Sequence, residues 1–231
     1  MNRFLQLFRK HKNKISPFYE TKVCFITAVY GKKNTSCMKY MKQTAPTDFI
    51  CFTDNPHMIP NGWIIDTTPY HNTDIDVMKY YKQSFQRISR LDKYEIIVWI
   101  DDAVEIIYNQ TSEYLLYNVP HRQIIWDEQS RSIQDIDTHY KMYVDEGYSN
   151  DFFADMSIHT QFRGAWITQF IAFANKDPDV RRLLSMWYSQ TVHEQIGFHY
   201  AAWKTRITPY LLHGRLVKGR KIQFYLAHDE N

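Results

Sequence analysis

Short apolar segments alternate along the chain with longer segments in which apolar residues recur at helical spacing. Strands are predicted where β-branched and aromatic residues concentrate near turn signals, as after the Asn61-Gly62 pair. On this basis we predict strands at 22–29, 48–53, 63–66, 95–100 and 165–174.

Helices are predicted from the spacing of apolar residues and from capping residues. Apolar residues recur at helical spacing over 75–90. Asp177 is a typical helix cap and Pro178 is tolerated in a first turn, so a helix is expected from there to about Gln190. Further helices are predicted at 127–143 and 194–205, and the polar loop 32–43 is expected to lead into a short helix.

This alternation of strands and helices predicts an α/β layered fold. The length of 231 residues suits one domain, which we place at 21–231 behind a basic leader at 1–20. Ligands of such sheets gather at the carboxyl ends of strands. Chemistry is therefore expected just after Val29, Thr53 and Ile100.

Charge and apolar content narrow the range of partners. The formal net charge of +3 is too small to favour nucleic acid by bulk electrostatics. A basic cluster lies in residues 1–14, where a membrane-surface helix and a solvated leader are alternatives. With no run of about 18 apolar residues, no membrane span is predicted. Cys24, Cys37 and Cys51 form no CxxC pair and are expected to be reduced thiols of a cytoplasmic protein.

An acidic pair, Asp101 and Asp102, follows the most apolar predicted strand. A buried carboxylate is costly unless it pairs or binds a metal. Mg²⁺ and Mn²⁺ prefer carboxylate oxygens and keep positions open for phosphate, and the departing diphosphate of a nucleotide-sugar needs such an ion. A helix cap or a turn is the alternative. Ala103 stands where an Asp-x-Asp motif would have its second acid.

Six segments, in order, carry a family resemblance: FITAVYG at 25–31, DFICFTDNP at 48–56, KYYK at 79–82, YEIIVWIDDAVEI at 94–106, HRQIIWDE at 121–128 and MWYSQTVHEQIGFHYAAWK at 186–204. With them the chain resembles a family of small GT-A glycosyltransferases of plants and bacteria, long catalogued as a domain of unknown function. It is also similar to the glycosyltransferase domains of large chlorella-type viruses, for which a host cytoplasm would be the location. The resemblance implies a three-layer α/β/α fold with a mixed central sheet.

For the metal site, the resemblance implies Asp101 as the first ligand of Mn²⁺ or Mg²⁺. Asp102 and the Ala103 region depart from the usual second acidic position. Many GT-A enzymes complete the metal shell with a histidine near the carboxyl end, for which His228 is the first candidate and His213 the second. The alternative for each is a surface histidine.

The resemblance also implies a donor site at the ends of the first two strands. Thr27, Ala28 and Tyr30 match the part that holds the base and ribose, and the Tyr30 ring could stack on a base. Thr53 and Asp54 match a second such turn, with ordinary turn chemistry as the alternative.

Cationic side chains are expected beside the donor diphosphate. Lys79 and Lys82 are three residues apart on a predicted helix and so share a face, where a solvated face is the alternative. His121 and Arg122 are expected to bind the diphosphate or the acceptor.

An inverting transfer needs a general base, and burial in a partly apolar cleft suits a carboxylate to that task because it raises the carboxylate's pKa. Glu194 occupies the position at which the family carries an acid followed by Gln and an aromatic residue. Stabilisation of the helix start is its alternative role. Asp127 and Glu128 are rival candidates for the base.

The predicted function is metal-dependent transfer of a hexose or deoxyhexose from a nucleotide-sugar, with a UDP-sugar as first choice, to a hydroxyl of a glycan acceptor. Inversion is preferred because of the Glu194 base. The alternatives are a degenerate, non-catalytic nucleotide- or glycan-binding module and a nucleotidyltransferase. No glycine-rich triphosphate loop supports the last of these.

Overall fold

The computed structural model describes residues 21–31, 35–70, 77–119, 124–128, 168–189, 194–217 and 221–223. Of these, 124–128, 195–196, 210–217 and 221–223 are described as backbone only. The predicted basic leader at 1–20 lies outside the described residues. Within the described helices, none is long and apolar enough to cross a membrane.

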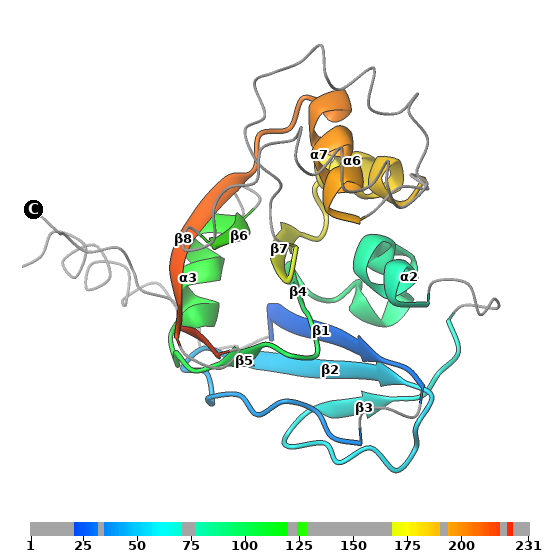
Figure 1. The fold of residues 1–231 in the computed structure, drawn as a ribbon, viewed down its shortest axis with the longest axis vertical. Helices are drawn as coiled ribbons and strands as arrows, with labels where there is room; N and C mark the ends of the chain where they lie inside the picture. The colour runs from blue at the N-terminus through cyan, green and yellow to red at the C-terminus, as the bar shows by residue number, and fades with distance from the viewer. Residues whose placement is uncertain are drawn as a thin grey trace, which may run out of the picture.

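Four parallel strands form the first half of the sheet (Figure 1). Their order is β3-β2-β1-β4, with bounds Ile64–Asp66 for β3, Thr47–Thr53 for β2, Val23–Val29 for β1 and Ile96–Ile100 for β4. Every residue of β1 and β4 is buried, as expected of central strands covered on both faces. These four strands confirm the predictions at 22–29, 48–53, 63–66 and 95–100.

The second half of the sheet makes it mixed. β7 (Phe170–Ala174) runs antiparallel to β4, and β6 (Ile124–Glu128) runs antiparallel to β7. β8 (Tyr210–Val217) is parallel to β6, β9 (Lys221–Gln223) is antiparallel to β8, and β5 (Glu105–Ile106) is parallel to β9. In the described part of the chain the strand order is therefore β3-β2-β1-β4-β7-β6-β8-β9-β5.

Helices cover both faces of this sheet. Figure 1 shows α2 (Val77–Gln83), α6 (Pro178–Tyr188) and α7 (Glu194–Thr205) on one side of β4 and β7, and α3 (Thr111–Asn118) on the other. Two apolar cores fill the space between the layers. The predicted three-layer α/β/α class with a mixed central sheet is confirmed.

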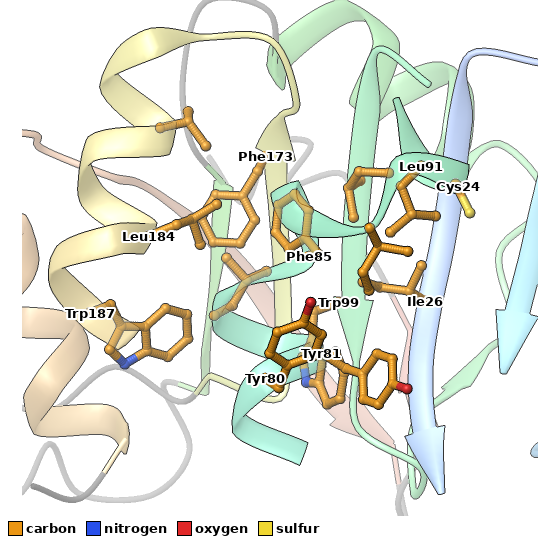
Figure 2. Packing of buried hydrophobic residues seen from close by; sticks show 14 of the residues in the cluster. Cys24, Ile26, Tyr80, Tyr81, Phe85, Leu91, Trp99, Phe173, Leu184 and Trp187 are labelled. Carbon is orange, nitrogen blue, oxygen red and sulfur yellow. The ribbon is translucent and has the colours of Figure 1, made fainter. Parts of the chain in front are cut away.

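Alternation along the strands divides the residues between the two cores. Ile26 and Trp99 point toward α2 and α6, where Tyr81, Phe85 and Leu184 pack against them (Figure 2). The neighbouring strand positions face the opposite core, which includes Phe25, Val98, Phe49, Trp63 and Leu115. The strands are thus held from both sides, and this fixes the positions at which they end.

The helix predicted from Asp177 is present. The Asp177 carboxylate accepts hydrogen bonds from the backbone N–H groups of Asp179 and Val180, and Pro178 is the first helical residue. The helix predicted at 75–90 is shorter than expected. α2 ends at Gln83, and two 3-10 turns, Phe85–Arg87 and Ser89–Leu91, follow it.

Two helix predictions are wrong where the structure describes the residues. Residues 35–43 contain isolated bridges and no helix. Asp127 and Glu128 end strand β6, so no helix begins at Asp127. The reason is tertiary, because β6 is hydrogen-bonded between β7 and β8, and neither pairing is visible in the local pattern. The rest of the predicted helix at 127–143 lies outside the described residues. The sequence analysis missed α3, β5, β6, β8 and β9.

Candidate active site

The acidic pair lies where several chain segments end at one edge of the sheet. β1, β2 and β4 are parallel, so their carboxyl ends share that edge, and β7 begins there because it is antiparallel to β4. The Asp101 N–H donates to the Gln169 carbonyl at 2.9 Å, and the Val104 N–H donates to the Asp101 carbonyl at 2.9 Å. Asp101 and Asp102 therefore sit in a tight turn that is tied to the start of β7.

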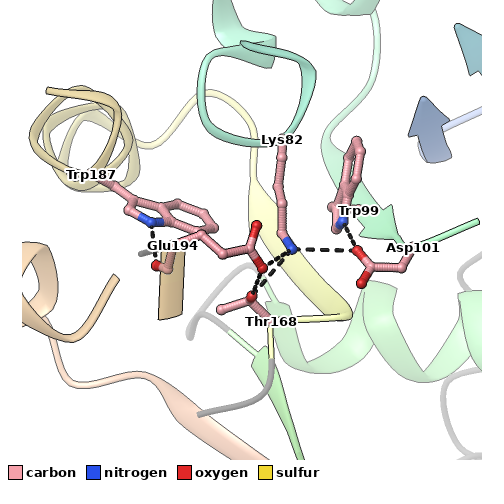
Figure 3. A network of polar contacts seen from close by, with 6 residues as sticks. All are labelled: Lys82, Trp99, Asp101, Thr168, Trp187 and Glu194. Atoms are coloured by element: carbon pink, nitrogen blue, oxygen red, sulfur yellow. Dashed lines mark hydrogen bonds and ion pairs between the residues drawn. The ribbon is translucent and has the colours of Figure 1, made fainter. Parts of the chain in front are cut away.

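One buried lysine connects this turn to the start of α7 (Figure 3). Lys82 Nζ lies 3.3 Å from Asp101 Oδ1 and 2.7 Å from Glu194 Oε1. It also donates to Thr168 Oγ1 at 3.1 Å. The Lys82 side chain is only 3% exposed, whereas the Asp101 and Glu194 side chains are 28% and 37% exposed. The ammonium is thus inside the protein, and both carboxylates also reach the surface.

The Asp101 carboxylate is oriented by two donors that reach the same oxygen. Trp99 Nε1 donates to Oδ1 at 2.6 Å, and Lys82 also donates to Oδ1. No hydrogen bond from the described residues reaches Oδ2. Burial raises the pKa of Asp101 above its ordinary value, although the Lys82 charge and the Trp99 hydrogen bond act in the opposite direction.

These residues fit a divalent cation that obtains most of its ligands from water and substrate. Mg²⁺ in phosphate-handling sites is held by one or two carboxylates together with substrate phosphates. Asp101 Oδ2 offers such a ligand, and its orientation is fixed by donors on Oδ1, as is usual around metal-binding carboxylates. Asp101 and Asp102 both line a small pocket beside this turn. The described residues contain no group of three His, Cys, Asp or Glu side chains placed to hold a metal.

Glu194 is held through its backbone as well as its side chain. It is the first residue of α7, and its carbonyl accepts from Trp187 Nε1 at 2.8 Å. Its Oε1 accepts from Thr168 Oγ1 at 2.5 Å in addition to Lys82. Trp187 is buried in the core and so anchors the backbone of Glu194.

A small pocket lies beside the acidic turn, between the ends of β1 and β4. It is lined by Thr27, Val29, Cys37, Met38, Trp63, Asp101, Asp102 and Val104. Thr27 is 3% exposed, and its hydroxyl has no hydrogen-bond partner among the described residues. A buried hydroxyl of this kind is costly unless a ligand or water bonds to it. The Thr27 hydroxyl is therefore a polar group in the pocket of Asp101 to which none of the described residues is hydrogen-bonded.

The predicted donor-binding turn contains several internal contacts. The Asp54 carboxylate accepts from the Gly31 N–H, with both oxygens 3.2 Å away, and Gly31 has a φ of 82°. Thr53 Oγ1 accepts from the Asn55 N–H at 3.1 Å. Tyr30 stacks on Tyr81 with ring centroids 5.6 Å apart, and the two hydroxyls are hydrogen-bonded at 2.7 Å. Ala28 is buried in the core. The ends of β1 and β2 are thus joined, while binding of a base stays a prediction.

The two predicted phosphate lysines lie in different surroundings. Lys82 is enclosed by carboxylates, whereas Lys79 Nζ lies 5.8 Å from the centre of the Tyr188 ring.

Cys24, Cys37 and Cys51 are all free thiols and all buried, as the sequence predicts.

Several candidates cannot be placed relative to this site. His121, Arg122 and His228 lie outside the described residues. Asp127 and His213 are described as backbone only, and they are register partners on β6 and β8. Glu128 pairs with Gly214 on the same strands.

Sequence reasoning missed three residues of the network. Trp99 could have been found, because it lies two positions before Asp101, and strand alternation carried one residue past Ile100 places both on one side. Thr168 and Trp187 gave no comparable signal. Thr168 is a single hydroxyl in the turn before β7, and Trp187 is an ordinary core position of α6.

No protein-family model and no curated protein sequence matches the chain. Among solved structures it is similar to the apo structure of the bifunctional glycosyltransferase WbbM, at 10% identity and a TM-score of 0.42, over 85% of this chain and 40% of that one. It is also similar to 4-diphosphocytidyl-2C-methyl-D-erythritol synthase from Anaerococcus prevotii DSM 20548, at 7% identity and a TM-score of 0.42, over 89% of this chain and 94% of that one.

The chain therefore spans about two fifths of the length of the WbbM structure. Similarity at this level carries no argument about activity. The α/β/α class rests on the sheet and its helices, and the resemblance to the small GT-A family stays a prediction.

Proposed function

We propose that the chain transfers a sugar from a nucleotide-sugar, with a UDP-sugar as first choice, to a hydroxyl of a glycan acceptor, with inversion and with a divalent metal as cofactor. The observation that carries the proposal is the Asp101–Lys82–Glu194 arrangement at the carboxyl edge of the parallel strands. One carboxylate there is suited to a metal and the other to a base. The family resemblance of the surrounding segments supports the same assignment.

Asp101 Oδ2 would hold the metal with help from Asp102, and His228 is the candidate for a further ligand. When bound, Mn²⁺ or Mg²⁺ neutralises charge on the leaving diphosphate. The small pocket with the Thr27 hydroxyl lies beside Asp101 and would give the bound donor one polar contact there. Of the three residues matched to the base and ribose, Thr27 lines this pocket, whereas Ala28 and Tyr30 pack with the core that includes Tyr81.

Glu194 would act as the general base. The acceptor hydroxyl gives its proton to the Glu194 carboxylate while its oxygen attacks the anomeric carbon. The bond from that carbon to the diphosphate oxygen breaks, and its electron pair leaves with the diphosphate. Lys82 favours the charged form of Glu194, which is the form that accepts a proton. A general base in position is worth about 10²–10⁴-fold in rate.

The test pairs donor binding with turnover in matched variants. A thermal-shift panel of nucleotide-sugars with Mn²⁺, Mg²⁺ or EDTA should show a metal-dependent rise in melting temperature with one nucleotide family. The rise should be lost in Asp101→Asn and kept in Asp92→Asn, an exposed aspartate near the other end of β4. Nucleoside diphosphate release should fall at least about 10²-fold in Glu194→Gln and stay unchanged in Glu95→Gln, whose surface carboxylate pairs with Lys22.

A binding module without activity is the alternative, favoured by Ala103 at the usual second acidic position. Metal-dependent binding with no turnover on any glycan or on water would support this module. Release of pyrophosphate from a nucleoside triphosphate would instead identify a nucleotidyltransferase. Full activity in Glu194→Gln would rule out Glu194 as the base.

A further inference from the structure

Thr168 lies between Lys82 and Glu194, and its hydroxyl is hydrogen-bonded to both. The residue is completely buried, and its Oγ1 is 3.1 Å from Lys82 Nζ and 2.5 Å from Glu194 Oε1. An ammonium can only donate, so the hydroxyl accepts from Lys82 and its one proton goes to Glu194. The two hydrogen bonds therefore run in one direction, with Lys82 donating to Thr168 and Thr168 donating to Glu194.

The same contacts distinguish the two oxygens of the Glu194 carboxylate. Oε1 accepts from both Lys82 at 2.7 Å and Thr168 at 2.5 Å, which accounts for the two lone pairs of that oxygen. A proton from an acceptor hydroxyl then has to go to Oε2. The Glu194 side chain is 37% exposed, so an acceptor can approach the carboxylate from the surface.

We propose that Thr168 is a positioning residue for the transfer, and that it directs Oε2 of Glu194 toward the acceptor hydroxyl. This role rests on the proposed function. Thr168 can position the base because the backbone is held both beside Thr168 and at Glu194. The carbonyl of Gln169, next to Thr168, accepts from the Asp101 N–H, and the Glu194 carbonyl accepts from the buried Trp187. Thr168 thereby sets the base relative to the turn that holds Asp101.

Two substitutions separate positioning from folding. Thr168→Val keeps the shape of the side chain and removes its hydrogen bonds, whereas Thr168→Ser keeps the hydroxyl. In Thr168→Val we expect kcat to fall about 10–100-fold, because the base loses its orientation, while the donor KM stays within about twofold. In Thr168→Ser we expect kcat within about threefold of wild type. A merely structural role predicts losses that follow the melting temperature and no rescue by serine.

The contact also has a readout that needs no activity. Melting temperatures of Thr168→Val, Glu194→Gln and the double variant form a cycle, and residues in direct contact should give non-additive changes. Additive changes, or wild-type kcat in Thr168→Val, would overturn the proposed role. Absence of wild-type turnover with every donor would overturn the proposed function and this role with it, and a coupled cycle would then report the contact alone.

Discussion

Substituting Lys82 by methionine removes a buried charge and keeps most of the length of the side chain. Lys82 Nζ lies 2.7 Å from Glu194 Oε1 and 3.3 Å from Asp101 Oδ1. With an effective dielectric constant of about 20, these attractions are about 6 and about 5 kcal/mol before desolvation. Burying the ammonium costs several kcal/mol, and water screens two carboxylates that are partly exposed. We expect Lys82→Met to lower the free energy of unfolding by about 2–4 kcal/mol, or the melting temperature by roughly 4–16 °C.

The loss should depend on pH in a definite direction. Burial raises the pKa of Asp101 above its ordinary value, and Lys82 opposes that rise. Without Lys82 the pKa of folded Asp101 rises further. When the folded pKa exceeds the unfolded one, the stability contribution is fully present below the unfolded pKa and is lost as pH rises through the folded pKa. The deficit of Lys82→Met should therefore be small near pH 4 and larger at pH 7.

The assay is denaturant unfolding of wild type and variant in EDTA at pH 4.5 and pH 7.5. Lys22→Met is the matched control, because Lys22 pairs with Glu95 at 2.8 Å on the surface, where both side chains are about half exposed. An exposed pair of this kind is worth less than about 1 kcal/mol. An equal deficit of Lys82→Met at both pH values, or a deficit no larger than that of the control, would refute the electrostatic reasoning.

Three further predictions concern the scaffold. Although burial raises it, the pKa of Asp66 is held below its ordinary value by the Thr68 hydrogen bond and Arg90. Asp66→Asn should cost about 2 kcal/mol at pH 7, and a deficit that does not shrink as pH falls through the folded pKa would contradict this. Asp177→Ala should cost about 1 kcal/mol through the lost cap, and wild-type stability would exclude that role. Gly62→Ala should cost more than about 1 kcal/mol, because φ is 96° and the new Cβ would lie 3.0 Å from Tyr40 Oη. Denaturant unfolding measures all three, and an unchanged midpoint in Gly62→Ala would show that the turn adapts.

The parallel half of the sheet could be predicted because each of its strands is indicated by its own sequence. β1 and β4 are mostly apolar and buried along their whole length, and β2 is buried from Phe49 on. A run buried on both faces can be identified without knowledge of its neighbours. The place of the acidic turn follows directly, since Asp101 and Asp102 come straight after β4. From these features the sequence predicts which edge of the sheet carries the site.

The rest of the site depends on packing between distant segments. Lys82 and Glu194 are 112 positions apart, and they meet because β7 is inserted antiparallel to β4 and α7 packs against α6. Helical spacing over 75–90 did not reveal that α2 ends at Gln83. The segment around Asp127 looked helical for a related reason, since its strand is specified by pairing with β7 and β8. The local sequence pattern indicates neither the pairing of β6 with β7 nor its pairing with β8.

The charges at the edge of the sheet bear on the order in which ligands bind. The carboxylates of Asp101 and Glu194 both contact the ammonium of Lys82, and Asp102 lines the pocket beside Asp101. A diphosphate approaching this turn would meet the Asp101 carboxylate at short range, where repulsion is poorly screened. A divalent cation reverses the sign of that interaction. We therefore expect a nucleotide-sugar to bind with the metal or after it, so that its affinity rises with Mn²⁺ concentration and nearly vanishes in EDTA. Donor affinity that is independent of the metal would mean that cations outside the described residues neutralise the edge, and the assignment of Asp101 as a metal ligand would then fail.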